Sequence, residues 1–165
     1  MLRRNHLLIA LLLFFLFTIR PRIDDIMMLR FDIYTVLNTN LLLAPLVFFG
    51  AIFPDIDFIW ILRKWHRKLL HNIIAVFSVA IPLLFIGNIF YNGFLVAGAF
   101  TLGSISHITA DSITEHGTYI FWPISKKFRL RGPVSTGTWE ENVAMILIVG
   151  LIFGVYYVVL TVLNL

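Results

Sequence analysis

Histidine and aspartate side chains suited to binding a metal ion recur at short spacings along a very apolar chain of 165 residues. In GSISHITADSITEHG, residues 103–117, His107 and Asp111 are four positions apart. On a helix both side chains would project from one face and could bind one ion. A salt-bridged pair at a helix end would have the same spacing. Ionisable residues inside apolar membrane segments are costly and are usually paired or functional, so both interpretations stand.

Two aspartates one residue apart follow another apolar run, in FFGAIFPDIDFIW. Pro54 is expected to end the preceding helix. In an extended segment, Asp55 and Asp57 would then point to the same side. Two carboxylates that face one way repel each other unless a cation lies between them, so the pair favours a metal site. The alternative is a polar turn at a helix end, which is commoner for a lone aspartate.

The stretch WHRKLLHN places two histidines, His66 and His71, around a basic cluster. The two histidines are five positions apart, which is too far for both to bind one metal ion from the same face of a helix. They can converge on one ion if a turn lies between them. Arg67 is a candidate for holding an anionic group such as phosphate through two hydrogen bonds. Membrane topology alone explains the remaining basic residues of the stretch, which are Arg63, Lys64 and Lys68.

Four other ionisable residues receive weaker assignments. His116 precedes Gly117, and an exposed loop is its expected place, with a metal-ligand role as the alternative. Glu115 is interpreted either as a charge at a helix end or as a base. Glu140 and Glu141 are expected to favour the first turn of a helix, with a role as active-site base as the minority interpretation.

The composition indicates that these polar groups belong to a membrane protein. Hydrophobic residues make up 59% of the chain and charged residues 13%, well outside the range of soluble domains. There is no cysteine, so any metal must be bound by nitrogen and oxygen ligands. The formal charge of +4 is attributed to topology and contact with lipid headgroups, and no nucleic-acid partner is expected.

The apolar runs predict an all-α fold, namely a polytopic helical bundle that forms a single integral membrane domain over residues 1–165. A short interfacial helix is expected over residues 20–35. Five membrane segments are predicted, over residues 7–19, 36–53, 73–91, 94–110 and 143–163.

Threading these segments alternately through the bilayer brings ten of the thirteen basic residues to one side, which the positive-inside rule makes cytoplasmic. The N-terminus and all five histidines fall on that side. Polar residues from all five segments would then converge in one layer at the cytoplasmic ends of the helices.

The ordered motifs resemble the YdjM-like, LexA-regulated family of membrane-bound metal-dependent hydrolases. An early His6 is followed by GAIFPDID, HRKLLHN and GSISHITADSITEHGTYIFWP, which match the family pattern through Pro123. Leu70 and Asn72 depart from the threonine and serine that the family carries beside its second histidine. The resemblance implies the following metal-binding or catalytic set: His6, Asp55, Asp57, His66, His71, His107 and Asp111.

The main hypothesis is a hydrolase of the inner or plasma membrane that acts on a phosphoester or lipid-linked substrate through metal-activated water. A divalent metal, Zn²⁺ in the first instance, is the expected cofactor, and membrane lipid the expected partner. Asp57, Arg67 and Asp111 are the candidate catalytic residues.

Two alternatives remain, a metal-binding transporter or sensor without turnover and a helical scaffold without metal. The chain lacks the H-E-x-x-H, Walker A, G-x-G-x-x-G and G-x-S-x-G motifs.

Overall fold

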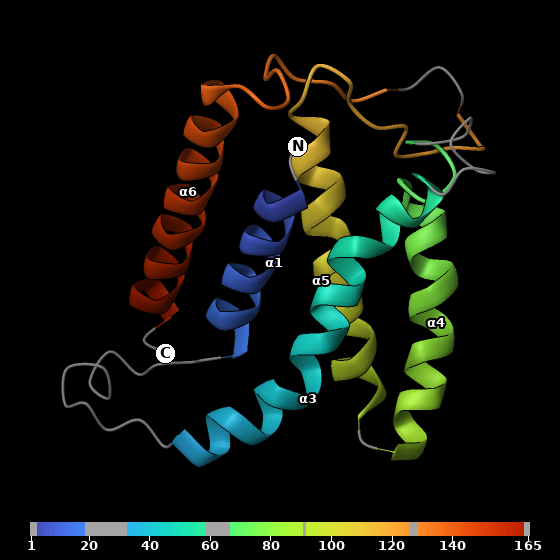
Figure 1. Cartoon of the computed structure of the whole chain (residues 1–165). Coiled ribbons are helices and arrows are strands. Elements are labelled where there is room, and N and C mark those ends of the chain that lie inside the picture. The colour runs from blue at the N-terminus through green and yellow to red at the C-terminus, as the bar shows by residue number, and fades with distance from the viewer. Residues whose placement is uncertain (1–2, 19–32, 59–66, 91, 126–128, 164–165) are drawn as a thin grey trace.

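The computed structural model describes residues 3–18, 33–58, 67–90, 92–125 and 129–163. Within these ranges every regular element is a helix, and there is no β-strand, only two isolated bridges, Thr114 with Val134 and Thr118 with Leu130. The prediction of an all-α fold is confirmed. The helices are α1 (Arg3–Thr18), α3 (Ile33–Ile52), the 3-10 helix η1 (Phe53–Phe58), α4 (Ile73–Phe90), α5 (Gly93–Ser112) and α6 (Trp139–Leu163) (Figure 1).

Two helices within the described residues, α4 and α5, are long and apolar enough to cross a membrane, as judged by length and composition. The other three predicted spans coincide with helices α1, α3 and α6 and stay predictions as membrane spans. Most of the predicted interfacial segment, residues 20–32, lies outside the described residues. The predicted elements therefore agree with the helices, whereas the number of spans is supported only in part.

Helix α5 packs against α1, α3 and α4, and two glycines permit its close approach to α3. A Cβ atom added to Gly103 would meet the carbonyl oxygen of Val47 and lie 2.8 Å from the amide nitrogen of Ala51. On the facing helix, a Cβ atom on Gly50 would meet the carbonyl oxygen of Phe100. Small residues allow backbones to approach in this way in membrane helix packing. The close approach aligns the end of α3 with the last two turns of α5.

Asn72 fixes the start of α4 and the turn that precedes it. Its Oδ1 accepts a hydrogen bond from the Ala75 amide at 2.8 Å, as a helix N-cap does. Its Nδ2 donates to the carbonyl oxygens of Lys68 at 2.6 Å and Leu69 at 2.8 Å. The asparagine that departs from the family's serine thus makes the local contacts that hold residues 68–72 in place.

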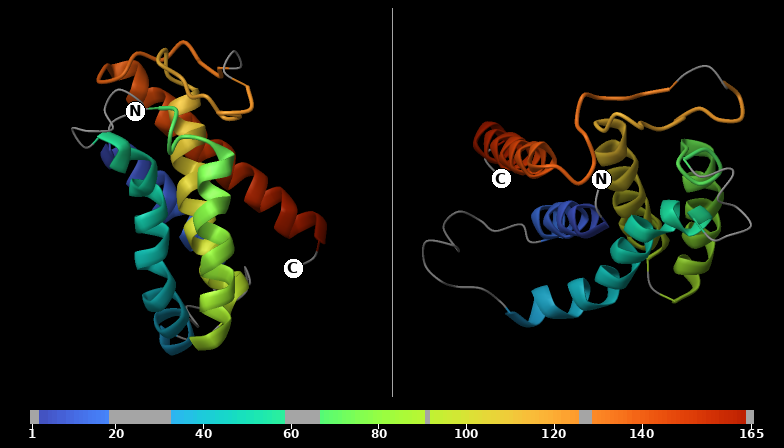
Figure 2. Two further views of the ribbon diagram at one scale, coloured as in Figure 1. Left: turned by 90° about the vertical axis from the view of Figure 1, so that its right-hand side faces the viewer. Right: turned by 45° about the horizontal axis from the view of Figure 1, so that its top comes forward.

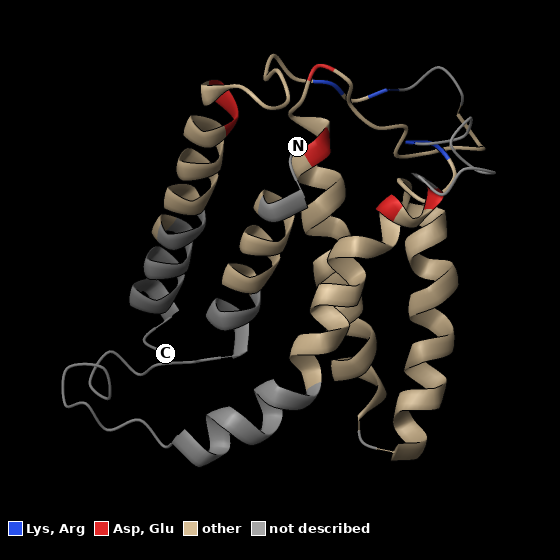
Figure 3. Ribbon diagram, in the orientation of Figure 1, with Lys and Arg blue, Asp and Glu red and all other residues tan. Residues whose placement is uncertain are grey.

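The described Lys, Arg, Asp and Glu residues gather at one end of the bundle (Figure 3). That end carries η1, the turn before α4, the loop between α5 and α6, and the N-terminal turns of α1 and α6. Helix α6 is inclined to α3 and α4 (Figure 2). The helices therefore bring sequence-distant polar residues to one level, as the threading predicted.

Candidate metal site

Six of the predicted site residues converge at this end of the bundle. Each comes from a helix end or a turn, where the side chain leaves the apolar part of its segment. Five of the six are buried, and Asp55 is partly exposed. The residues are His6 on α1, Asp55 and Asp57 on η1, His71 in the turn before α4, and His107 and Asp111 on α5.

Four donor atoms, which we call the cage, lie close together: one nitrogen each from His71 and His107 and one oxygen each from Asp55 and Asp111. His71 Nε2 lies 3.4 Å from Asp111 Oδ2 and 3.8 Å from Asp55 Oδ1. His107 Nε2 lies 3.6 Å from each of the same two oxygens. A tetrahedral zinc ion bound at its usual distances separates its ligand atoms by roughly 3.3 Å. Asp55, His71 and His107 form one group of three whose ligand atoms all lie within 4.8 Å of one another, and Asp111 adjoins both of its histidines.

The orientation of His107 is set by the backbone of a neighbouring helix. Its Nδ1 lies 2.6 Å from the carbonyl oxygen of Ala51, in the last turn of α3. A carbonyl only accepts, so Nδ1 carries the hydrogen and Nε2 carries the lone pair. Within the described part of the chain, Nε2 has no hydrogen-bond partner and faces two carboxylates. A cation bound between the His107 nitrogen and the two carboxylates would offset the repulsion among these three electron-rich groups.

Asp57 lies on the opposite side of the His71 ring from the cage. Its Oδ2 is 3.5 Å from His71 Nδ1 and also accepts from the Leu70 amide at 3.5 Å. Metal-binding histidines usually present their second nitrogen to a carboxylate or carbonyl in this way. The geometry places Asp57 behind His71, where it orients the ring.

The expectation that Asp55 and Asp57 point to the same side is wrong. It assumed an extended segment, but residues 53–58 form the 3-10 helix η1, which directly continues α3. Three residues complete a turn of such a helix, so side chains two positions apart diverge by about 120°. The two aspartates therefore contact different nitrogens of His71.

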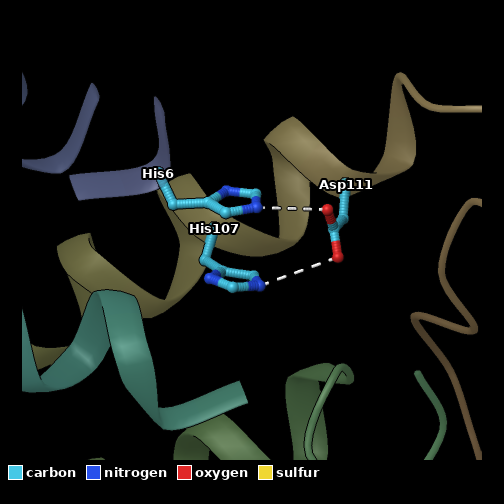
Figure 4. Close-up of side chains that lie close together, drawn as sticks. All are labelled: His6, His107 and Asp111. Atoms are coloured by element: carbon cyan, nitrogen blue, oxygen red, sulfur yellow. Dashed lines mark ion pairs between the residues drawn. The ribbon is translucent and has the colours of Figure 1, made fainter. Parts of the chain in front are cut away.

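His6 contacts the other oxygen of Asp111. Its Nε2 lies 3.2 Å from Asp111 Oδ1, and its ring stacks on His107 with centroids 3.8 Å apart (Figure 4). His6, His107 and Asp111 also form a second possible three-ligand group. His6 is thus placed either to orient Asp111 or to add a ligand beside the cage.

Arg67 lies at the edge of the site. Its Nη1 is 3.8 Å from Asp111 Oδ2 and donates to the Gly117 carbonyl oxygen at 3.4 Å. The backbone φ of 65° puts this arginine in the left-handed region, which is unfavourable for a residue with a Cβ atom. Its side chain is 21% exposed, so the guanidinium borders both the buried cage and the surface.

The carboxylates around His71 dominate its protonation. Burial alone lowers the pKa of His71, but hydrogen bonding to Asp111 and Asp57 outweighs it, so the net pKa is raised. The carboxylates beside His71 therefore favour positive charge at the position of this ring.

The structure does not bring every candidate into the site. His66 lies outside the described residues. His116 is exposed in the loop after α5, the location expected for it, and Glu115 is exposed in the same loop, just past the end of the helix. Glu140 is exposed in the first turn of α6, again as expected.

Glu141 is the residue whose environment the sequence did not disclose. It lies in the first turn of α6, as predicted, yet its side chain is fully buried. Its Oε1 accepts from Asn5 Nδ2 at 2.7 Å, and Oε2 accepts from the Gly137 amide at 2.7 Å. The only signal was the polar Asn5 beside His6, at the start of an apolar segment.

Comparison with known proteins identifies a family. The family model described as YdjM inner membrane protein matches residues 1–164. Proteins named inner membrane protein YdjM from Escherichia coli (strain K12) and Shigella flexneri are each 31% identical to the chain over 105 residues. Each alignment covers 53% of this chain and 53% of the relative, so the match spans about half the length of these curated proteins. No solved structure matches significantly.

Proposed function

This chain belongs to the YdjM family of inner membrane proteins, and we propose that it is an integral-membrane, metal-dependent hydrolase. Its site would act on a phosphoester, carried by a lipid or a lipid-linked molecule, at the level of the headgroups. Three features support this proposal. They are the four atoms of the cage, the contacts that orient His71 and His107, and the position of Arg67 at the edge of the cage.

The observation that carries the metal assignment is the pair of contacts made by His107. Nδ1 is committed to the Ala51 carbonyl, and Nε2 faces two carboxylates without a hydrogen-bond partner in the described residues. Nitrogen and oxygen donors in a four-atom cage suit Zn²⁺, with Asp55, His71, His107 and Asp111 as its ligands. An ion held there supplies Lewis acidity at neutral pH.

The chain's own residues supply the remaining roles in this proposal. Asp57 holds the His71 ring in position through Nδ1, and His6 holds Asp111 through Oδ1. Arg67 presents a guanidinium next to the cage and binds the phosphate of the substrate. Because Asp57 lies behind the His71 ring, Asp111 is the carboxylate at the cage that takes up the proton released as water attacks.

The proposed topology has five membrane spans, with the N-terminus and the site on the cytoplasmic side. The described charged residues gather at one end of the bundle, which supports a common depth for the site (Figure 3). With the basic residues of the whole chain counted, that end is the one the positive-inside rule assigns to the cytoplasm.

Hydrolysis of phospholipid by the purified, zinc-loaded protein in mixed micelles tests the proposal. We expect turnover by the wild type that is lost in His107→Ala and retained in His116→Ala, whose exposed histidine is the matched control. Arg67→Ala is expected to raise KM more than it lowers kcat. Metal binding without turnover of any phosphoester or phospholipid would reject the hydrolase and favour a metal sensor.

A further inference from the structure

A buried hydrogen bond joins the first turns of the two terminal helices. Asn5 is 1% exposed and Glu141 is 0% exposed, and 136 positions separate them in the sequence. Asn5 Nδ2 donates to Glu141 Oε1 at 2.7 Å. Hydrogen bonds to both carboxyl oxygens favour the ionised form, and an ionised acceptor makes such bonds stronger than bonds between neutral groups. The Gly137 amide bonds the second oxygen of the same carboxylate and fixes its orientation.

Asn5 is the immediate neighbour of His6. Consecutive residues on an α-helix are about 100° apart around the axis, so one can face α6 while the other faces α5. Holding Asn5 against α6 therefore fixes the rotation and depth of α1. The rotation and the depth of α1 together determine whether His6 Nε2 reaches Asp111 Oδ1, which lies 3.2 Å away.

An apolar pocket lies between α1 and α6 near this contact. A cavity of about 350 Å³ lies among α1, α5 and α6 and is lined almost entirely by apolar atoms. Ile9 and Leu13 line it from α1, and Ile148 and Leu151 from α6. Because the side chains that the structure describes leave this pocket open, the polar contact between Asn5 and Glu141 has a larger part in setting the position of α1.

We propose that Glu141 is a positioning residue of the metal site, acting through Asn5 to hold His6 against Asp111. This inference rests on the proposed metal site and adds a fifth helix to its support. The carboxylate of Glu141 does not touch the cage in this assignment. It acts through Asn5, whose neighbour His6 contacts the cage residue Asp111.

A charge swap tests this role in the full-length protein in detergent, with Co²⁺ affinity and the visible Co²⁺ spectrum as readouts. Asn5→Asp places a second carboxylate against that of Glu141, so the two side chains repel each other instead of forming a hydrogen bond. We expect Co²⁺ binding to weaken about 10-fold, as it does when a contact that positions a metal ligand is lost. Simple electrostatics predicts the opposite sign, because the variant adds negative charge near a cation site. Combining Asn5→Asp with Glu141→Gln restores a donor and an acceptor, and should recover most of the affinity and the wild-type spectrum.

Asn142→Asp is the matched control, since it makes the same chemical change at an exposed position of the same helical turn. Wild-type affinity in Asn5→Asp, or a double variant no better than that single variant, would overturn the positioning role. If Asn5→Asp yields no folded protein, Asn5→Ala replaces it, with the same 10-fold loss expected and unchanged affinity as the contrary result. Failure of the wild type to bind Co²⁺ would instead reject the metal site, and this inference with it.

Discussion

His107 Nδ1 lies 2.6 Å from the carbonyl oxygen of Ala51, so the end of α3 determines which nitrogen of a histidine on α5 carries the lone pair. Carbonyls in the last turn of a helix have no partner within that helix and are available for such a contact. The same close approach of α3 and α5 that needs Gly50 and Gly103 brings this carbonyl to the ring. The packing of α3 against α5 and the proposed metal binding are therefore linked at His107.

The two aspartates of η1 should respond differently to the same substitution. Asp55→Asn removes a donor of the cage and is expected to abolish stoichiometric metal binding. Asp57→Asn removes the charge behind His71 and should weaken affinity by about 10- to 100-fold while leaving the stoichiometry intact. Zinc titration with a competing chelator distinguishes the two. Equal losses would show that Asp57 is itself a ligand.

Metal affinity should fall in acid. The carboxylates raise the pKa of His71, so the ring keeps its proton to a higher pH than an ordinary histidine does. A metal ion must displace that proton from His71 to bind. Metal affinity is therefore at its maximum above the raised pKa and declines as the pH falls through it, by up to about tenfold per pH unit for one proton. Co²⁺ titrations between pH 8.5 and 6 measure this slope. A flat profile would argue against His71 as a ligand.

Two glycines of α5 offer a matched test of the helix packing. Gly103→Ala would place a methyl group against the backbone of α3 and is expected to destabilise the fold by about 1–3 kcal/mol. A Cβ atom on Gly98 meets no atom within 4 Å, so Gly98→Ala should be neutral or slightly stabilising. Thermal unfolding in detergent compares them. Equal melting temperatures would contradict the close approach of α3 and α5.

The proposed orientation in the membrane can be mapped with single cysteines, because the chain has none of its own. His116→Cys lies in the exposed loop at the charged end, and Phe90→Cys lies at the end of α4, where Phe90 is 82% exposed. A thiol reagent that does not cross membranes should label only Phe90→Cys in intact inner-membrane spheroplasts. It should label His116→Cys after permeabilisation. The reverse pattern would place the site on the outer side.

The sequence was sufficient to predict the helices because long apolar runs with Gly, Pro and Asn at their ends permit few other structures. It also predicted the convergence of His71, His107 and Asp111, since alternating threading places their segment ends at one level. It could not predict that Asp55 and Asp57 diverge, because a DxD pattern does not distinguish an extended segment from a 3-10 turn. The Asn5 and Glu141 contact joins residues 136 positions apart and depends on how α6 packs.

The metal content of the purified protein, measured by mass spectrometry after dialysis against trace zinc, tests the metal centre most directly. The wild type and the His116→Ala control should each retain about one ion per chain, as a single four-ligand cage requires. His107→Ala should retain less than about a tenth of that amount, because a ligand of the cage is missing. A wild type without metal, or a His107→Ala variant with the full complement, would show that this cluster is not a metal site.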